Sequence, residues 1–183
     1  EKWFPADSMT IMIVDDTKEN INVLRRTLTT VGCRISVALN GKMALDLIPK
    51  LKPDLVLLDV MMPDMDGYEV CRRLKENPDL QNIPVIFITA KGDIEDVVEG
   101  FEAGAVDFIM KPFRQEEVLA RVRTHLTLSA ALKKLIQDSE TDPLTGLFNR
   151  RTFMKRIENE AARFKRSKKP FSILFGDIEF FKK

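Results

Sequence analysis

The chain has 183 residues, of which 44% are hydrophobic and 31% are charged, so one ordinary domain plus a fragment, or two small domains, can be expected. This composition is typical of a globular protein with a sizeable core. The formal net charge of +1 excludes an overall field that would favour nucleic acid or a membrane surface.

The two cysteines, Cys33 and Cys71, are isolated within apolar patterns. Because this spacing forms neither a disulfide framework nor a metal-binding motif, it favours a reducing cytoplasm. The longest apolar run, Leu55–Met62, is far shorter than a membrane span. The first residues lack the layout of a signal peptide, and we expect residues 1–9 to be an N-terminal extension.

Short apolar runs alternate with helical patterns from Thr10 to about Arg114. The runs are Ile11–Val14, Ile35–Leu39, Leu55–Leu58, Val85–Ile88 and Val106–Met110. Strand–helix alternation of this kind predicts an α/β fold with a doubly wound, five-stranded parallel sheet.

The helical patterns between these runs have recognisable boundaries. Asn40, Asp66 and Asp93 are predicted to cap helices, and Gly32 and Gly104 are predicted to end them. The helix after Asp93 is predicted to carry one apolar stripe, formed by Ile94, Val97, Val98 and Phe101.

Polar residues stand at the predicted carboxyl ends of four strands: Asp15, Asp16, Asp59, Thr89 and Lys111. In open parallel sheets functional groups collect beyond these ends. Three neighbouring carboxylates repel one another unless a cation lies between them, and Mg²⁺ prefers such oxygen ligands. A hydroxyl and an ammonium group suit a bound phosphoryl group, which a carboxylate can accept covalently.

Each of these residues also has a simpler interpretation. An Asp pair after a strand is usually a helix cap, a Thr is a common strand residue, and a Lys before Pro is usually solvated. The agreement of four strand ends favours a single site.

Four segments, Ile13–Asp16, Leu57–Gly67, Ile88–Ala90 and Lys111–Phe113, resemble the motifs of response-regulator receiver domains in order and spacing. The resemblance covers residues 10–128. It implies a flavodoxin-like fold with strand order 2-1-3-4-5.

The resemblance also implies roles for the acidic residues. Asp59 would be phosphorylated by a sensor histidine kinase or a phosphotransfer protein. Asp16, Asp59 and the backbone carbonyl of Met61 would bind Mg²⁺ directly, and Asp15 would act through water.

By the same resemblance, Lys111 would pair with phosphate oxygens and Thr89 would hydrogen-bond one of them. Phe108 occupies the position of the family's switch aromatic and, lacking a hydroxyl, would move by packing alone. The family further implies a cis bond between Lys111 and Pro112.

After Arg114 a helical pattern continues to about Asp138, which is long for a receiver's last helix. Leu119, Val122 and Leu126 are expected to face the receiver, whereas Leu128, Leu132 and Leu135 have the spacing of a coiled-coil seam. This seam fits dimerisation and packing against the next domain equally well. His125 is expected to be a surface or seam residue, and residues 129–141 are expected to form a signalling helix and linker.

A second unit is predicted from residue 142 onward. Asp142–Arg151 predicts a turn leading to an Asn149 cap, a helix follows, and Phe171–Phe175 predicts a strand that leads to Asp177. The apolar face of the helix is Phe153, Ile157, Ala161 and Phe164. Basic residues between Arg150 and Lys169 fit a solvated helix face or a binding patch.

Asp142–Arg151 and Asp177–Lys182 resemble the opening of diguanylate cyclase (GGDEF) domains, although Glu179 stands where that family usually has Asp. The resemblance implies that Asp177 and the Ile178 backbone bind Mg²⁺ and that Lys182 approaches a nucleotide phosphate. Residues 142–183 would be a truncated start of this domain. Without the family's GG(D/E)EF turn, we expect the chain as given to be inactive as a cyclase.

These features predict a two-component response regulator. Its receiver would switch a diguanylate cyclase output, which converts GTP to cyclic di-GMP, by dimerising on phosphorylation. The alternative is a phosphorylation-dependent interaction or dimerisation switch with a degenerate, non-catalytic output. A DNA-binding role is disfavoured because no helix-turn-helix pattern follows the receiver.

Overall fold

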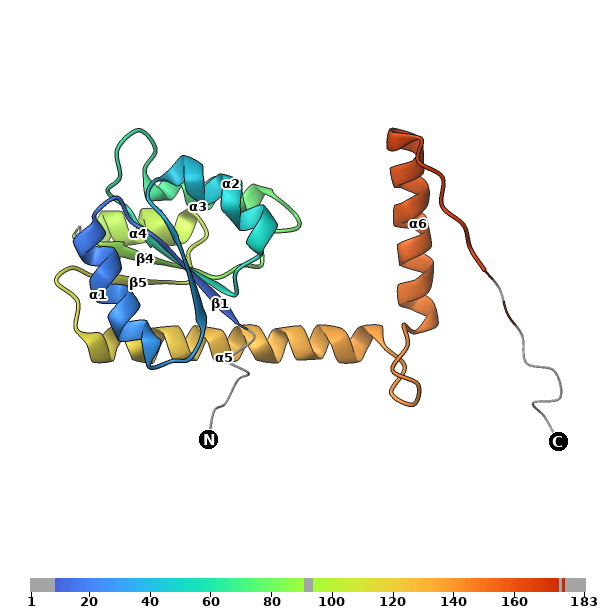
Figure 1. Cartoon of the computed structure of the whole chain (residues 1–183). Helices are drawn as coiled ribbons and strands as arrows, with labels where there is room; N and C mark the ends of the chain where they lie inside the picture. Colours follow the sequence, from blue (N-terminus) through green and yellow to red (C-terminus); the bar gives the residue numbers. More distant parts are fainter. Residues whose placement is uncertain (1–8, 91–93, 175, 177–183) are drawn as a thin grey trace. The chain divides into compact units, whose positions relative to one another are not determined.

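The computed structural model of the chain describes residues 9–90, 94–174 and 176 (Figure 1). The chain forms two compact units that divide between Leu132 and Lys133. None of the helices within the described ranges is long and apolar enough to cross a membrane.

A five-stranded parallel sheet forms the centre of the first unit (Figure 1). Its strands are β1 (Thr10–Val14), β2 (Arg34–Ala38), β3 (Leu55–Asp59), β4 (Val85–Thr89) and β5 (Asp107–Met110). They lie in the order β2-β1-β3-β4-β5, and every neighbouring pair is parallel. The predicted fold class and strand order are confirmed.

Helices cover both faces of the sheet. They are α1 (Lys18–Thr29), α2 (Gly41–Leu51), α3 (Gly67–Glu76), α4 (Ile94–Glu102) and α5 (Gln115–Glu140). Alternate residues of each inner strand enter opposite cores, one with α2 and α3 and the other with α1 and α5. Because both faces are covered, β3 and β4 are buried along their whole length, which explains their continuous apolar runs.

Most of the predicted helix boundaries are found in the structure. The side chains of Asn40 and Asp66 each accept a hydrogen bond, at 2.8 Å, from the backbone N–H three residues later. Gly32 and Gly104 have positive φ angles of 83° and 96°, as expected of residues that end helices. Asp93 lies outside the described residues.

Two features of α4 and α5 differ from the prediction. Val98 and Phe101 on the predicted stripe of α4 are each 49% exposed, because α4 turns Gly100 toward the Phe87 ring and the sheet. His125 does not lie with the exposed seam residues: it is half-buried on the side of α5 near β5, where its Nε2 is 3.1 Å from Asp107 Oδ2.

Along α5, the apolar residues divide much as predicted. Val118, Val122 and Leu126 are fully buried in the core shared with α1, and Leu119 packs against it. The predicted seam residues are exposed: Leu128 by 59%, Leu132 by 50% and Leu135 by 67%.

In the second unit, hydrogen bonds connect the last turn of α5 to α6 (Arg150–Ser167). Asp142 Oδ1 accepts bonds from the backbone N–H groups of Leu144 and Thr145, and so closes the turn. Asn149 caps α6, as predicted, by accepting from the Thr152 N–H, and its Nδ2 donates to the Ser139 carbonyl at 2.7 Å.

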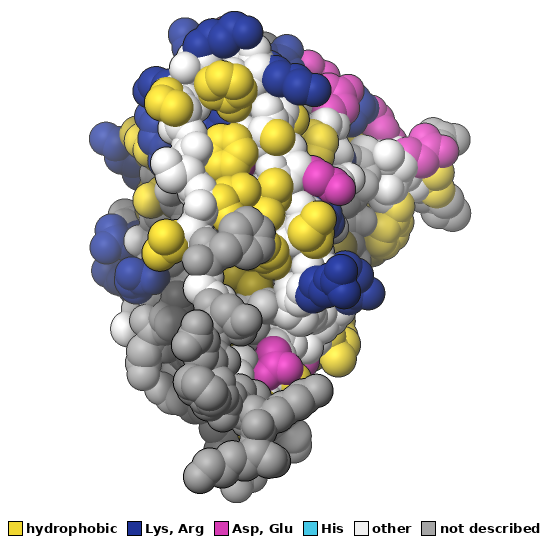
Figure 2. All heavy atoms as spheres, turned by 90° about the vertical axis from the view of Figure 1, so that its right-hand side faces the viewer, with side chains coloured by type: hydrophobic (Ala, Val, Ile, Leu, Met, Phe, Trp, Pro, Cys, Tyr) yellow, Lys and Arg dark blue, Asp and Glu magenta, His cyan; other side chains and the backbone are white. Residues whose placement is uncertain are grey.

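The strand predicted at Phe171–Phe175 is wrong for its described part. Residues 171–174 have no strand structure, because no described segment of the second unit lies alongside them as a hydrogen-bonded partner. Phe153, Phe164, Phe171 and Ile173 are about 40% exposed. Figure 2 shows apolar side chains gathered in one area of the view, with Lys and Arg at its edges.

Candidate functional site

Three carboxylates from two strand ends form an acidic cluster. β1 and β3 are neighbours in the sheet, with Val14 opposite Leu58, so that Asp15 and Asp59 leave the sheet side by side. Asp15, Asp16 and Asp59 offer oxygen atoms that all lie within 4.8 Å of one another. This all-oxygen set fits a hard divalent cation such as Mg²⁺.

Lys111 completes the cluster from the end of β5. Its Nζ lies 2.8 Å from Asp59 Oδ2 and 3.1 Å from Asp15 Oδ2, and its backbone N–H donates to the Thr89 carbonyl at 2.7 Å. The Lys111–Pro112 peptide bond is cis, as the resemblance implied. The structure therefore gathers Asp15, Asp16, Asp59 and Lys111, whose roles stay predictions.

The two members of the Asp pair have different surroundings. Asp15 is 1% exposed and accepts hydrogen bonds from the Thr17 N–H and from Asn20 Nδ2, whereas Asp16 is exposed. Asn20 holds the Asp15 carboxylate in place. The sequence did not reveal this role, because Asn20 fits the pattern of any polar residue of a helix. Asp16 is the more accessible carboxylate of the pair for an incoming cation.

Burial and neighbouring charges shift the pKa values of Asp59 and Lys111. Asp59 is 4% exposed, and this burial raises its pKa; the bond and charge of Lys111 lower it, and the Asp15 charge raises it further. Burial by itself would lower the pKa of Lys111, but Asp59 and Asp15 outweigh it and raise that pKa. The site thus holds a buried carboxylate that one ammonium group does not fully compensate, which again favours a bound cation.

The segment after Asp59 folds back tightly over the strand end. The Met61 N–H lies 3.3 Å from Asp59 Oδ1, and the Gly67 N–H donates to the Val60 carbonyl at 2.9 Å. A side chain at Gly67 would overlap the Asp59 carbonyl oxygen and lie 2.9 Å from Val60 Cα. Gly67 therefore lets α3 begin against Asp59, a role that the sequence, read only for a helix start, did not reveal.

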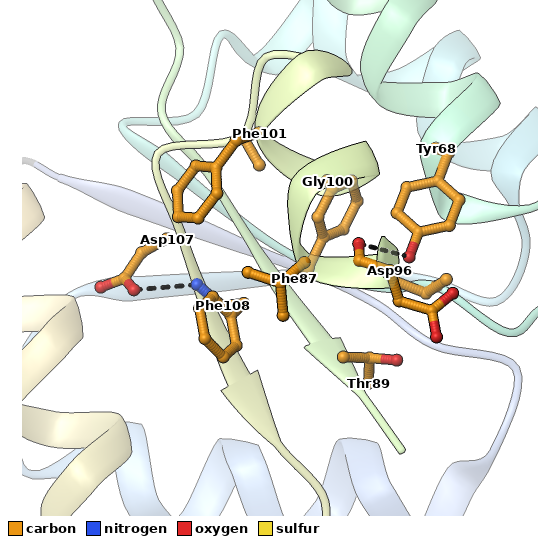
Figure 3. A pocket seen from close by; sticks show the side chains of 11 residues that line it. Tyr68, Phe87, Thr89, Asp96, Gly100, Phe101, Asp107 and Phe108 are labelled. Atoms are coloured by element: carbon orange, nitrogen blue, oxygen red, sulfur yellow. Dashed lines mark hydrogen bonds between the residues drawn. The ribbon is translucent and has the colours of Figure 1, made fainter. Parts of the chain in front are cut away.

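Thr89 and Phe108 lie beside a pocket between α4 and the sheet (Figure 3). Thr89 follows Ile88, the residue that pairs with Asp59, and is 4% exposed at the end of β4. Phe108 is half-buried on β5, opposite Phe87. Both residues line this mostly apolar pocket, whereas the four residues of the acidic site do not.

The residues predicted to act in the second unit, Asp177, Ile178 and Lys182, lie outside the described residues.

Comparison with known families identifies the family of the first unit. Residues 11–123 match the family described as "Response regulator receiver domain". The chain belongs to this family. In addition, residues 139–183 match "Diguanylate cyclase, GGDEF domain", so the receiver is followed by a GGDEF fragment.

Curated relatives of the chain have different descriptions. A "Probable cyclic di-GMP phosphodiesterase" of Vibrio cholerae is 47% identical over 117 residues, which are 64% of this chain and 26% of that protein. The "Response regulator PleD" of Caulobacter vibrioides is 41% identical over 130 residues, which are 71% of this chain and 29% of PleD. The chain thus spans less than a third of the length of these relatives.

Solved receivers have the same fold. A putative response regulator from Chloroflexus aurantiacus has a TM-score of 0.62 and 38% identity, covering 64% of this chain and 97% of that one. The signal receiver domain of a histidine kinase from Syntrophus aciditrophicus has a TM-score of 0.62 and 39% identity, covering 66% and 91%.

Proposed function

We propose that this receiver accepts a phosphoryl group on Asp59 from the phosphohistidine of a sensor histidine kinase or phosphotransfer protein. The observation that carries the proposal is the convergence of three carboxylates and Lys111 at adjacent strand ends. Membership of the receiver family supports the same assignment.

In the proposed reaction an Asp59 carboxylate oxygen attacks phosphorus, an O–P bond forms, and the P–N bond to the donor histidine breaks. The departing imidazole retains the bonding electron pair. Asp16, Asp59 and the Met61 carbonyl would hold Mg²⁺, with Asp15 acting through water; the bound ion supplies positive charge against the phosphoryl oxygens.

In this proposal Lys111 would contact both the free and the phosphorylated forms of Asp59. Its Nζ contacts Asp59 Oδ2 at 2.8 Å, so it offsets part of the charge of the free carboxylate and would lie within reach of oxygens added there. Thr89 would donate its hydroxyl to one of these oxygens. Phe108 would then move into the pocket that it shares with Thr89, and the face formed by α4, β5 and α5 would repack.

For the intact protein we propose a diguanylate cyclase output that condenses GTP to cyclic di-GMP and is switched by dimerisation. The match of residues 139–183 to the GGDEF family and the likeness to PleD support this output. A receiver at residues 10–128, a linker at 129–141 and a cyclase segment at 142–183 would form a PleD-like arrangement in the cytoplasm, without DNA as a partner.

A second candidate, an interaction switch with a non-catalytic output, is favoured by one observation: Glu179 occupies a position where GGDEF domains usually carry Asp. The two functions differ in whether the full-length protein carries an intact GG(D/E)EF turn. Sequencing the gene would decide: an intact turn would support the cyclase, and a degenerate turn would support the interaction switch.

The phosphorylation site is tested by incubating the chain with acetyl phosphate and Mg²⁺ and measuring its intact mass. We expect wild type to gain one phosphoryl group, Asp59→Asn to gain none, and the exposed control Asp46→Asn to behave as wild type. Labelling that persists in Asp59→Asn would remove Asp59 from this role.

Dimerisation is tested by measuring the solution mass with and without beryllofluoride and Mg²⁺. We expect the mass to double when both are present. An unchanged mass would contradict dimerisation as the switch.

A further inference from the structure

Four residues of β5 and α5 form a connected cluster: Asp107, Phe108, Arg121 and His125. Asp107 begins β5 and stands next to Phe108, whereas Arg121 and His125 lie one turn apart on α5. Asp107 Oδ1 accepts from the Phe108 N–H at 2.9 Å and from Arg121 Nη1 at 2.6 Å, and Asp107 Oδ2 lies 3.1 Å from His125 Nε2. Figure 3 shows the first of these bonds. Asp107 thus connects α5 to the backbone of Phe108.

Arg121 also contacts the ring of Phe108. The centre of its guanidinium lies 5.9 Å from the ring centroid, within the range of a cation–π interaction. Its Nε donates to Glu117 Oε1 at 3.1 Å. Since carboxylates of β5 and α5 both bind the guanidinium, they hold it near the ring.

The ion pair between Asp107 and Arg121 is stable at neutral pH. Burial would raise the pKa of Asp107, but its hydrogen bonds from Arg121, the Phe108 N–H and His125 outweigh burial and lower that pKa. The bond to Asp107 raises the pKa of Arg121. The ion pair therefore persists in the resting receiver.

Phe108 is held between two neighbours. On the side of α4, its ring meets the Phe101 ring edge-on, at 6.1 Å and 81°. On the side of α5, it meets the Arg121 guanidinium. A ring that moves into the pocket toward Thr89 gives up the contact with Arg121, and no described cation lines that pocket to replace it.

We propose that Arg121, positioned by Asp107 and Glu117, holds Phe108 in its resting position and thereby sets how readily the receiver switches. Arg121 is a positioning residue, since it acts on Asp59 only through Phe108. The inference rests on the proposed function, because it requires that Phe108 move when the acidic site is filled.

The test measures the affinity of the chain for beryllofluoride in the presence of Mg²⁺. Any contact that stabilises the resting state weakens binding of a ligand that prefers the switched state. Arg121→Gln should therefore bind beryllofluoride about two- to fivefold more tightly than wild type. This is the range expected for the loss of a partly exposed cation–π contact. Arg123→Gln, an exposed arginine on the same helix, is the matched control and should not change the affinity. An Arg121→Gln affinity equal to or weaker than wild type would overturn the inference.

A double-mutant cycle separates this role from general destabilisation. In a Phe108→Leu background there is no ring to hold, so Arg121→Gln should have no further effect on beryllofluoride binding. Arg121→Lys keeps the charge but loses the planar fork, and its affinity should fall between those of wild type and Arg121→Gln. An Arg121→Gln effect of the same size in both backgrounds would mean that Arg121 does not act on Phe108.

Failure of this inference can be distinguished from failure of the proposed function. If wild type is labelled on Asp59 and binds beryllofluoride while Arg121→Gln does not tighten binding, only the role of Arg121 is wrong. If wild type neither accepts a phosphoryl group nor binds beryllofluoride, the proposed function is wrong and this inference falls with it.

Discussion

Replacing Lys111 with Met tests the charge balance of the acidic site. Met is similar in length but carries no charge, so the variant leaves Asp59 and Asp15, which are 4% and 1% exposed, without their ammonium partner. Breaking a buried ion pair from one side costs roughly 3–5 kcal/mol. Because the Lys111 side chain is 21% exposed and water reaches it, we expect a loss near the lower end, about 3 kcal/mol at pH 7 without Mg²⁺.

The pH dependence of this loss follows from Asp59. Removing Lys111 removes the bond and the charge that lower the pKa of Asp59, while burial and the Asp15 charge continue to raise it. An acid whose pKa is higher in the folded than in the unfolded protein opposes folding when it is ionised. The stability deficit of Lys111→Met should therefore be present at neutral pH and shrink as the pH falls and Asp59 takes up a proton.

Urea unfolding followed by circular dichroism measures the deficit. Lys42→Met, at an exposed lysine, is the control and should stay within about 0.5 kcal/mol of wild type. Saturating Mg²⁺ should stabilise Lys111→Met more than wild type, since a cation bound at 100 times its Kd contributes about 2.7 kcal/mol and meets no competing ammonium group. A Lys111→Met stability equal to that of the control, or a deficit that Mg²⁺ does not reduce, would refute this account of the site.

Two further changes test the same site. Asp59→Asn should be more stable than wild type at pH 7, because burial raises the pKa of Asp59 and its ionised form opposes folding. This gain in stability should fade as the pH falls toward the ordinary carboxylate value of 3.8. Equal stability of the two proteins in urea at pH 7 would contradict this. Gly67→Ala should lower stability by roughly 1–3 kcal/mol and slow labelling by acetyl phosphate, because its Cβ would overlap the Asp59 carbonyl oxygen. A variant labelled at the wild-type rate would show that the close approach of Gly67 to Asp59 is unimportant for phosphorylation.

The position of the site could be predicted because two simple rules act together. Continuous apolar runs identify buried parallel strands, and the carboxyl ends of such strands meet at one edge of the sheet. Asp15, Asp59 and Lys111 therefore converge although they are far apart in sequence. Asn20 could not be assigned in this way, because its contact with Asp15 depends on how the first turn of α1 leaves the strand.

The failures arose where a pattern on one element was interpreted without its neighbours. The helical periodicity of α5 placed His125 next to the coiled-coil seam, but Asp107 on β5 is a closer partner and turns it toward the sheet. Phe171–Leu174 has the composition of a strand, yet a strand needs a hydrogen-bonded neighbour, and none of the described second unit supplies one.

The sheet register connects the acidic site to the face formed by α4, β5 and α5, but register alone does not establish energetic coupling between the two. Asp59 pairs with Ile88 on β4, and Phe87, the preceding residue, pairs with Phe108 on β5. Paired strand residues that are rigid transmit no conformational change from Asp59 to Phe108. In our proposal Phe108 has two positions, because a pocket lies on one side of its ring and the Arg121 guanidinium lies on the other. Under this proposal, packing and Arg121 would set the balance between the two positions, since the ring has no hydroxyl to bind a new partner. The double-mutant cycle measures that balance.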